Sequence, residues 1–267
     1  QSVAVRIIVD REEEIRKFKP EEYWTIDAKF IPKGSRKSFS ASLYSDANGK
    51  IKIENQEQAE KIEQDLADAE YMITKVKHGT RRKTPAPPFI TSTLQQEASR
   101  KLGFQSRRTM KVAQELYEGV DIEGMGATGL ITYMRTDSLR ISDVAKEEAA
   151  QYILNRFGEK FLPAKPRVFK TKSNAQDGHE AIRPSMPSLS PEDVKASLTS
   201  DQFKLYNLIW NRFMASQMSD CIQKTTQAEI SAKEYIFKAS GYYVDFEGFT
   251  TLYVESKDTE EEKSTQL

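Results

Sequence analysis

The order of two hydrophobic periodicities along the chain limits its fold more than any other feature. Strand-like alternation occupies residues 23–53 and returns at residues 221–254, whereas the long stretch between them is patterned for helices. Strands bury every second side chain and helices bury a stripe that repeats about every 3.6 residues, so the two patterns predict different elements. We therefore expect an α+β protein in which the two β segments form one discontinuous domain and the helical part is inserted into it.

The first β segment carries two strand patterns and a hairpin. YWTIDAKFI, residues 23–31, alternates with a period near two, and KSFSASLYS gives a second strand. Asn48-Gly49 precedes KIKIE and is a dipeptide that two-residue hairpin turns favour. Residues 56–69 then place apolar side chains three or four positions apart, which predicts a helix.

A proline-rich linker follows and leads into the helices. The stretch YMITKVKHGTRRKTPAPPF passes from a strand into an extended basic linker, in which we expect His78 to be a solvated loop residue. Pro85, Pro87 and Pro88 make this linker a domain boundary, because proline and the residue before it disfavour helix. The helices that we expect beyond it cover residues 91–103, 106–119, 142–157 and 201–218, with another helix start at Ser190.

The first two of these helices have the spacing of a helix-turn-helix. Thr91 or Ser92 can cap one that ends near Gly103, and Ser106 can cap the next, which leaves GFQS as the connection. Most helix pairs of this kind are simply packed together, so the pattern alone does not establish DNA binding. A non-catalytic helix-turn-helix DNA-binding module stays open as an alternative function, and it would need a basic recognition helix and a dimer.

Composition and motifs exclude several classes of protein. No apolar run approaches the roughly 18 residues that a membrane-spanning helix needs, and the N-terminal segment lacks the pattern of a signal peptide. The single cysteine, Cys221, excludes an internal disulfide or a cysteine-rich zinc site and fits a reducing compartment. Spacings typical of metal sites and of nucleotide-binding loops are missing, so we expect neither ligand. Since the chain begins without methionine and ends in a charged tail, we expect it to be part of something longer.

The distribution of charge is more informative than the net charge of zero. Ten lysines and arginines lie between Lys75 and Lys111, and the one acidic residue in that interval is Glu97. Such an asymmetry is typical of a surface that binds a polyanion, although a solvated basic face would give the same pattern. The members of this basic region that we expect to contact nucleic acid are Arg81, Arg82, Arg107, Arg108 and Lys111.

The stretch GLITYMRTDS surrounds a tyrosine with groups that could activate it. A free phenol has a pKa of about 10, so Tyr133 would need a nearby positive charge or a proton acceptor to act as a nucleophile. Arg135 would lie on the same side of an extended segment and offers a fork that suits phosphate. Thr132, Thr136 and Ser138 add hydroxyl donors. The combination fits covalent attack on a phosphodiester, and the alternative is a core tyrosine beside a surface arginine.

The second candidate constellation is GHEAIRPS. His179 is one of two histidines in the chain and lies in a polar loop without apolar periodicity. His179 and Arg183 are four residues apart, so one helical turn would point both at a common anion. The histidine could share a phosphate's charge or relay a proton, and Glu180 could orient either neighbour. The alternative is a capping histidine and a surface salt bridge.

Together, these blocks resemble the signature of the type IA DNA topoisomerases, most closely the bacterial topoisomerase I group. GLITYMRTDS and HEAIRPS carry the resemblance, and KTPAPPFITSTLQQEASRKLGF, RTMKVAQELYEG and the opening QSVAVRIIVDREEEI support it. The fold that it implies is a discontinuous antiparallel β arch domain with an inserted, mainly helical, winged-helix-like domain that carries the tyrosine. A tyrosine recombinase is a further interpretation, but the Tyr-x-Arg order with HEAIR downstream does not match the arrangement of arginines in those enzymes.

The resemblance implies a role for each candidate residue. Tyr133 would be the nucleophile that takes the 5′ phosphate of one DNA strand, Arg135 would position the scissile phosphate, and His179 would contact the same region. The neighbouring residues that we expect to contact DNA are Thr132, Thr136, Ser138 and Arg183. An intact enzyme of this kind would cleave one strand, pass the other and reseal without ATP.

The resemblance also implies a domain plan and a set of partners. Mg²⁺ would be bound in the intact enzyme by a Toprim domain that this chain does not match, so we expect no metal here and no relaxation by the chain alone. We expect a cytoplasmic, nucleoid-associated monomer that binds single-stranded or underwound DNA, no nucleotide and no membrane. The implied parts are a base-domain remnant at 1–22, the β arch at 23–88 and 220–267, and the catalytic-tyrosine domain at 89–219.

Overall fold

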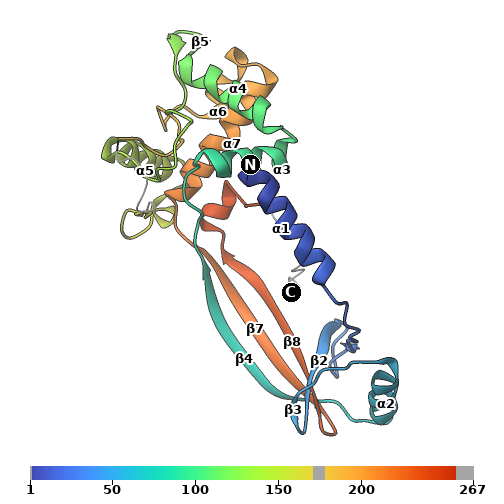
Figure 1. Cartoon of the computed structure of the whole chain (residues 1–267). Helices are drawn as coiled ribbons and strands as arrows, with labels where there is room; N and C mark the ends of the chain where they lie inside the picture. Colours follow the sequence, from blue (N-terminus) through green and yellow to red (C-terminus); the bar gives the residue numbers. More distant parts are fainter. Residues whose placement is uncertain (1, 171–177, 257–267) are drawn as a thin grey trace. The chain divides into compact units, whose positions relative to one another are not determined.

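The computed structural model describes residues 2–170 and 178–256 of the chain (Figure 1). These residues form two compact units. Unit 1 contains described residues of 2–79 and 225–242, and unit 2 contains those of 80–224 and 243–256. The domain limits expected from sequence fall at other positions and stay a prediction.

A six-stranded sheet brings the two β segments together. Its strands are β1 (Asp27–Phe30), β2 (Phe39–Asp46), β3 (Gly49–Lys50), β4 (Met72–Lys83), β7 (Cys221–Ala232) and β8 (Tyr235–Phe246). The strand order is β1-β2-β8-β7-β4, and β3 also pairs with β2. Strand β2 is antiparallel to β1, β3 and β8. The structure thus confirms that strands from both ends of the chain share one sheet.

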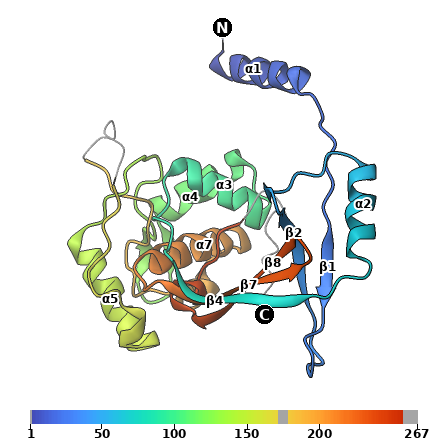
Figure 2. The ribbon, with the colours of Figure 1, turned by 90° about the horizontal axis from the view of Figure 1, so that it is seen from below.

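One helix covers part of this sheet in unit 1. Helix α2 (Gln56–Leu66) begins at Asn55, whose side chain accepts a hydrogen bond from the Gln58 backbone and so caps the helix. Figure 2 shows α2 beside β1 of this sheet. The apolar stripe of α2 includes Ile62 and Leu66, which lie in one buried cluster with Phe237 of β8. Helix α1 (Val3–Lys17) also belongs to unit 1 and has no buried residue.

Unit 2 is mainly helical and is organised around α7. Four of its side chains, at Leu205, Tyr206, Ile209 and Phe213, are fully buried at the three- and four-residue spacing of one helix face. Helices α3, α4 and α6 contact α7. The helices are α3 (Thr91–Leu102), α4 (Ser106–Glu118), α5 (Asp143–Phe157), α6 (Pro191–Val194) and α7 (Ser200–Ser216), with the short turns η1 (Glu159–Phe161), η2 (Lys195–Ser197) and η3 (Gly248–Thr251).

Three expectations about strands were wrong. Strand β4 continues to Lys83, so the basic residues placed in a linker lie on a strand, and His78 Nδ1 lies 3.2 Å from Thr226 Oγ1 of β7. Pairing with β7 continues the strand to Lys83, two residues before the first proline. The strand expected over residues 23–31 is limited to β1. The expected loop after α4 contains a hairpin, β5 (Val120–Ile122) and β6 (Gly126–Thr128), which turns at Gly124 with a positive φ.

The expected caps of α3 and α4 were also wrong, because both helices begin earlier than expected. Ile90 caps α3, and Thr91 is already its first helical residue. Thr93 Oγ1 accepts the Ile90 backbone N–H at 3.0 Å and so satisfies this donor at the start of the helix. Gln105 precedes Ser106 as the cap of α4. No helix in the described ranges is long and apolar enough to cross a membrane.

Candidate active site

The loop that carries Tyr133 is hydrogen-bonded to two other segments of unit 2. The Leu130 backbone N–H donates to the Leu116 carbonyl of α4 at 2.7 Å. On the other side, the Thr132 N–H donates to the Arg183 carbonyl at 3.0 Å, and Ile131 forms a bridge with Pro184. The two motif blocks identified in the sequence are therefore neighbours in space.

Residues alternate between buried and exposed along this loop. Met134, Thr136 and Ser138 are buried, whereas Tyr133 and Arg135 are exposed. The phenol of Tyr133 and the guanidinium of Arg135 are therefore both open to solvent, with the buried Met134 between them in the chain. With 38% of its surface exposed, Tyr133 is not a core tyrosine.

Two rings flank the phenol. The centroid of the His179 ring lies 5.6 Å from that of Tyr133, and the planes are tilted by 37°. Tyr117, in the last turn of α4, meets the Tyr133 ring edge-on at a centroid distance of 5.4 Å. Such contacts hold an aromatic ring in a limited range of orientations. Tyr117 was not among the residues predicted for the site, because nothing in its local pattern distinguishes it from other residues near a helix end.

An open depression is lined by His179, the ring that contacts Tyr133, and by Arg135. Its charged side chains are Arg135 and Asp137, and the first residues of α3 also line it. The N-terminus of a helix carries free N–H groups and a partial positive charge, both of which favour an anion. The residues that line the depression are Ile90, Thr91, Ser92, Arg135, Thr136, Asp137 and His179.

The three hydroxyl groups expected to contact DNA make internal hydrogen bonds instead. Thr132 Oγ1 donates to the Ala181 carbonyl at 2.6 Å. Thr136 Oγ1 accepts the Ser138 N–H at 3.1 Å, and Ser138 Oγ accepts the Arg140 N–H at 3.2 Å. These bonds shape the loop, and a direct contact between any of the three hydroxyls and DNA stays a prediction.

The expected helical turn from His179 to Arg183 is absent. Residues 181–184 are instead held to neighbouring segments by bridges at Ile182 and Pro184, and these pairings replace helical hydrogen bonds. The Arg183 side chain is 9% exposed and donates to Glu180 Oε2 at 2.5 Å and to Ser142 Oγ at 3.3 Å. Because burial demands such partners, Arg183 supports the loop from inside, and the geometry does not favour direct contact with DNA.

The basic residues identified in the sequence differ in the hydrogen bonds and the exposure of their side chains. Arg108 of α4 donates twice to the carboxylate of Asp201, each time at 2.8 Å, and this partner raises the pKa of its guanidinium. Arg81 of β4 donates to Gln223 at 2.8 Å. The side chains of Arg82, Arg107 and Lys111 are exposed. The basic region is thus spread over β4 and two helices, and some of its charge is already paired.

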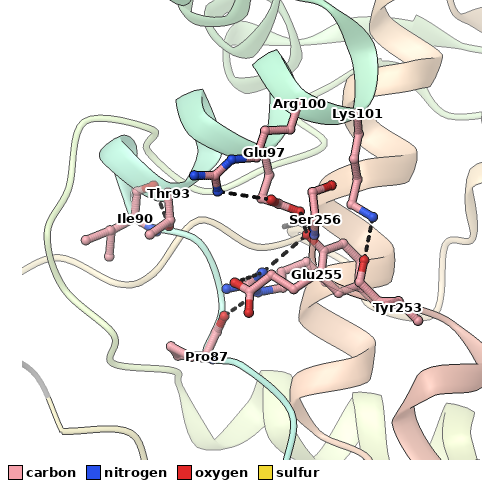
Figure 3. A network of polar contacts seen from close by, with 11 residues as sticks. Pro87, Ile90, Thr93, Glu97, Arg100, Lys101, Tyr253, Glu255 and Ser256 are labelled. Carbon is pink, nitrogen blue, oxygen red and sulfur yellow. Dashed lines mark hydrogen bonds and ion pairs between the residues drawn. The ribbon is translucent and has the colours of Figure 1, made fainter. Parts of the chain in front are cut away.

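A buried polar network, which sequence analysis missed, lies at α3 (Figure 3). Arg212 of α7 donates through Nε to the Pro87 carbonyl at 2.6 Å and through Nη1 to the Tyr253 hydroxyl at 3.2 Å. The Tyr253 hydroxyl in turn donates to Glu97 of α3. Burial, and then this bond to Glu97, raises the pKa of Tyr253 well above its ordinary value. The network joins α3, α7, the proline linker and the segment after η3.

The side chains that the structure describes offer no set of ligands for a metal ion. In the part of the chain that the structure describes, no group of three or more histidine, cysteine, aspartate or glutamate side chains could hold a metal ion. The Mg²⁺ that the resemblance implies therefore has no binding residues among these, and no step of the chemistry proposed below passes through it.

Comparison with known proteins assigns the chain to a family. The model of a DNA topoisomerase family matches residues 1–267. Among solved structures, the full-length topoisomerase I from Thermotoga maritima in a monoclinic crystal form is similar, with a TM-score of 0.76 and 35% sequence identity. The match covers 98% of this chain and 41% of that one, so the chain spans about two-fifths of the length of this relative.

Proposed function

The chain belongs to the DNA topoisomerase family, in its bacterial type IA branch, and on that premise we propose that Tyr133 is the nucleophile that cleaves one DNA strand. The observation that supports this most is the arrangement of the loop. It leaves the phenol of Tyr133 and the guanidinium of Arg135 exposed two residues apart, with His179 against the tyrosine ring.

The proposed step exchanges one phosphodiester for another. The phenolic oxygen of Tyr133 attacks the phosphorus and loses its proton, while the bond from phosphorus to the 3′ oxygen breaks and that oxygen takes a proton. The product is a 5′-phosphotyrosine link and a free 3′ hydroxyl. Because the new ester keeps the energy of the broken bond, the 3′ hydroxyl can reverse the step without ATP.

The surrounding residues suit this chemistry. Negative charge grows on the phosphoryl oxygens as the phenol attacks, and Arg135 is placed to donate to them. His179 lines the same depression, and the N-terminus of α3 adds a fixed positive potential. The aromatic contacts of Tyr117 and His179 limit the directions from which the phenol can approach.

The proposal extends to the parts and partners of the molecule. Helices α3 and α4 followed by the hairpin β5–β6 support a winged-helix-like arrangement in unit 2, and the shared sheet supports an arch domain. We propose a single-stranded or underwound segment of DNA as substrate, met by a monomer. Strand passage and resealing would belong to a longer protein, with any Mg²⁺ bound outside the described residues.

Covalent trapping tests the proposal. The protein, expressed at its natural length, is incubated with a single-stranded oligonucleotide labelled at its 3′ end and then denatured. The label should stay with the protein, because the 5′ phosphate of the labelled fragment joins the tyrosine. Tyr133→Phe should abolish this product, whereas Tyr243→Phe, which changes an exposed tyrosine on β8, should not.

Two outcomes would contradict the proposal. Label that still transfers to the Tyr133→Phe protein would assign the nucleophile elsewhere. A sequence-specific footprint on duplex DNA, with no covalent product from the unmodified protein, would favour the helix-turn-helix module instead.

A further inference from the structure

Thr91, the first residue of α3, is hydrogen-bonded to the backbone on both sides of Arg135. Its hydroxyl donates to the Met134 carbonyl at 2.8 Å and lies 3.1 Å from the Thr136 carbonyl. The same hydroxyl accepts the Thr136 backbone N–H at 2.9 Å. A fourth contact runs from the Thr91 N–H to the Thr136 carbonyl at 3.0 Å. One side chain therefore fixes both peptide groups that flank the arginine.

The segment before Thr91 is itself anchored in the core. The Phe89 ring is fully buried, and the Phe89 carbonyl accepts the Ile182 N–H at 2.8 Å. Two residues earlier, the Pro87 carbonyl accepts the Arg212 guanidinium of the buried network. Contacts with α7 and with the segment after His179 therefore fix the stretch that contains Thr91. Through its hydrogen bonds, Thr91 in turn fixes the tyrosine loop.

We propose that Thr91 is a positioning residue for strand cleavage, which holds Arg135 in the direction that the reaction needs. The proposal rests on the proposed function of Tyr133 and Arg135. Arg135 has no hydrogen-bond or ion-pair partner among the described residues, so its direction depends on the backbone that carries it. The Thr91 hydroxyl is the side-chain group that fixes this backbone, and it acts through Arg135 without contacting the phosphate.

The neighbouring threonine provides a matched control. Thr93 lies in the same first turn of α3, but its hydroxyl accepts the Ile90 N–H at 3.0 Å and donates to the Ile90 carbonyl at 3.2 Å. Thr91→Val and Thr93→Val each remove a hydroxyl with little change of shape, and each leaves a backbone N–H without its partner. Only Thr91→Val removes a contact to the tyrosine loop.

The test compares Thr91→Val, Thr91→Ser and Thr93→Val in the protein at its natural length. We expect Thr91→Val to slow covalent trapping at saturating oligonucleotide at least about tenfold. The dissociation constant of the oligonucleotide should change less than about threefold, because the variant loses stabilisation of the transition state and not of the bound substrate. Thr91→Ser keeps the hydroxyl and should retain the rate within about threefold, and Thr93→Val should lower thermal stability without slowing the reaction. Equal rates for the two valine variants, or no rescue by serine, would overturn the proposal.

A second measurement separates this proposal from the proposed function. Hydrogen exchange at the Thr136 amide, measured on the 267-residue chain, reports the contact without any DNA. Thr91→Val should speed that exchange at least about tenfold and Thr93→Val should not, since an amide exchanges when its hydrogen bond is lost. If the unmodified protein forms no covalent product, the proposed function fails by itself. If the exchange is unchanged in Thr91→Val, Thr91 does not position the loop.

Discussion

The loop around Tyr133 and the buried network around Arg212 use arginine in opposite ways. In the loop, Arg135 is exposed and has no hydrogen-bond or ion-pair partner among the described residues. In the network, Arg212 is 2% exposed and its guanidinium donates to Pro87, Tyr253 and Glu255. A buried arginine needs internal acceptors for its donors, whereas an exposed one keeps them for a ligand. The comparison separates side chains that hold unit 2 together from side chains that are free to meet DNA.

The largest effect on stability should follow from replacing the buried arginine, Arg212. Arg212→Met should lower the free energy of unfolding by about 2–4 kcal/mol, because the Pro87 carbonyl and the Tyr253 hydroxyl lose the donor that they bind inside unit 2. Urea unfolding measures this loss. Arg107→Met, at an exposed position of α4, is the control and should change the free energy by less than about 0.5 kcal/mol. Similar losses for the two variants would remove the distinction between buried and exposed arginines.

Replacing the exposed arginine, Arg135, should have the opposite effect: a loss of activity without a loss of stability. Arg135→Ala should slow covalent trapping by about 10²–10³-fold, as expected when one preorganised donor to a developing anion is lost. The free energy of unfolding should change by less than about 0.5 kcal/mol, since the Arg135 side chain is exposed. Arg135→Lys keeps the charge without the fork and should fall between the two rates. A variant that loses stability together with its activity would make Arg135 a structural residue.

The buried tyrosine of the network, Tyr253, should make the free energy of unfolding depend on alkaline pH. The raised pKa of Tyr253 means that the folded protein keeps this proton at pH values where the unfolded chain has lost it. The resulting stability is complete below the ordinary pKa of about 10 and decreases as the pH rises above it. In Tyr253→Phe, the decline of the unfolding free energy above about pH 10 should be shallower by about 1.4 kcal/mol per pH unit.

Urea unfolding at a series of alkaline pH values checks this slope. Tyr243→Phe removes an exposed phenol and serves as the control, with the decline expected to match that of the unmodified chain. If the unfolding free energy of Tyr253→Phe declines with pH as steeply as that of the unmodified chain, the network does not hold the Tyr253 hydroxyl. Tyr235, whose pKa burial raises to about 12, contributes to the decline in all three proteins.

The smallest effect concerns two neighbouring arginines of α4. Arg107 is exposed, whereas Arg108 is bonded to Asp201. If Arg107 contacts a DNA phosphate, Arg107→Gln should reduce the slope of log affinity against log salt by about 0.7 for a single-stranded oligonucleotide. Arg108→Gln should change that slope less, because its donors already have an acceptor. Fluorescence anisotropy across a salt series measures both, and equal slopes for all three proteins would exclude a phosphate contact at Arg107.

Some of the site could be predicted because its pattern is local. GLITYMRTDS predicts an extended segment, and the same period of two that places Tyr133 and Arg135 together also places Thr136 and Ser138 on the opposite, buried side. The burial of Thr136 and Ser138 could therefore have been expected, and a contact of their hydroxyls with DNA stays a prediction. The helices were predictable for the same reason, since α7 shows its buried stripe in its own sequence.

Other parts depend on contacts between residues that are far apart in the chain. Arg183 was expected on a helical turn, but bridges from Ile182 to Phe89 and from Pro184 to Ile131 hold that segment extended. Neither partner can be identified from the spacing of residues in HEAIRPS. The network of Glu97, Arg212 and Tyr253 has the same origin, because three elements supply one side chain each.

The central claim is that Tyr133, and no neighbouring group, forms the bond to DNA. Tyr117 is the natural competitor, because its ring lies 5.4 Å from that of Tyr133. After trapping, nuclease treatment and cleavage with trypsin, both tyrosines fall in one peptide, residues 112–135. Fragmentation of that peptide by mass spectrometry should place a 5′-phosphonucleotide on Tyr133. An adduct on Tyr117, or the absence of any adduct on this peptide from a protein that traps DNA, would contradict the account.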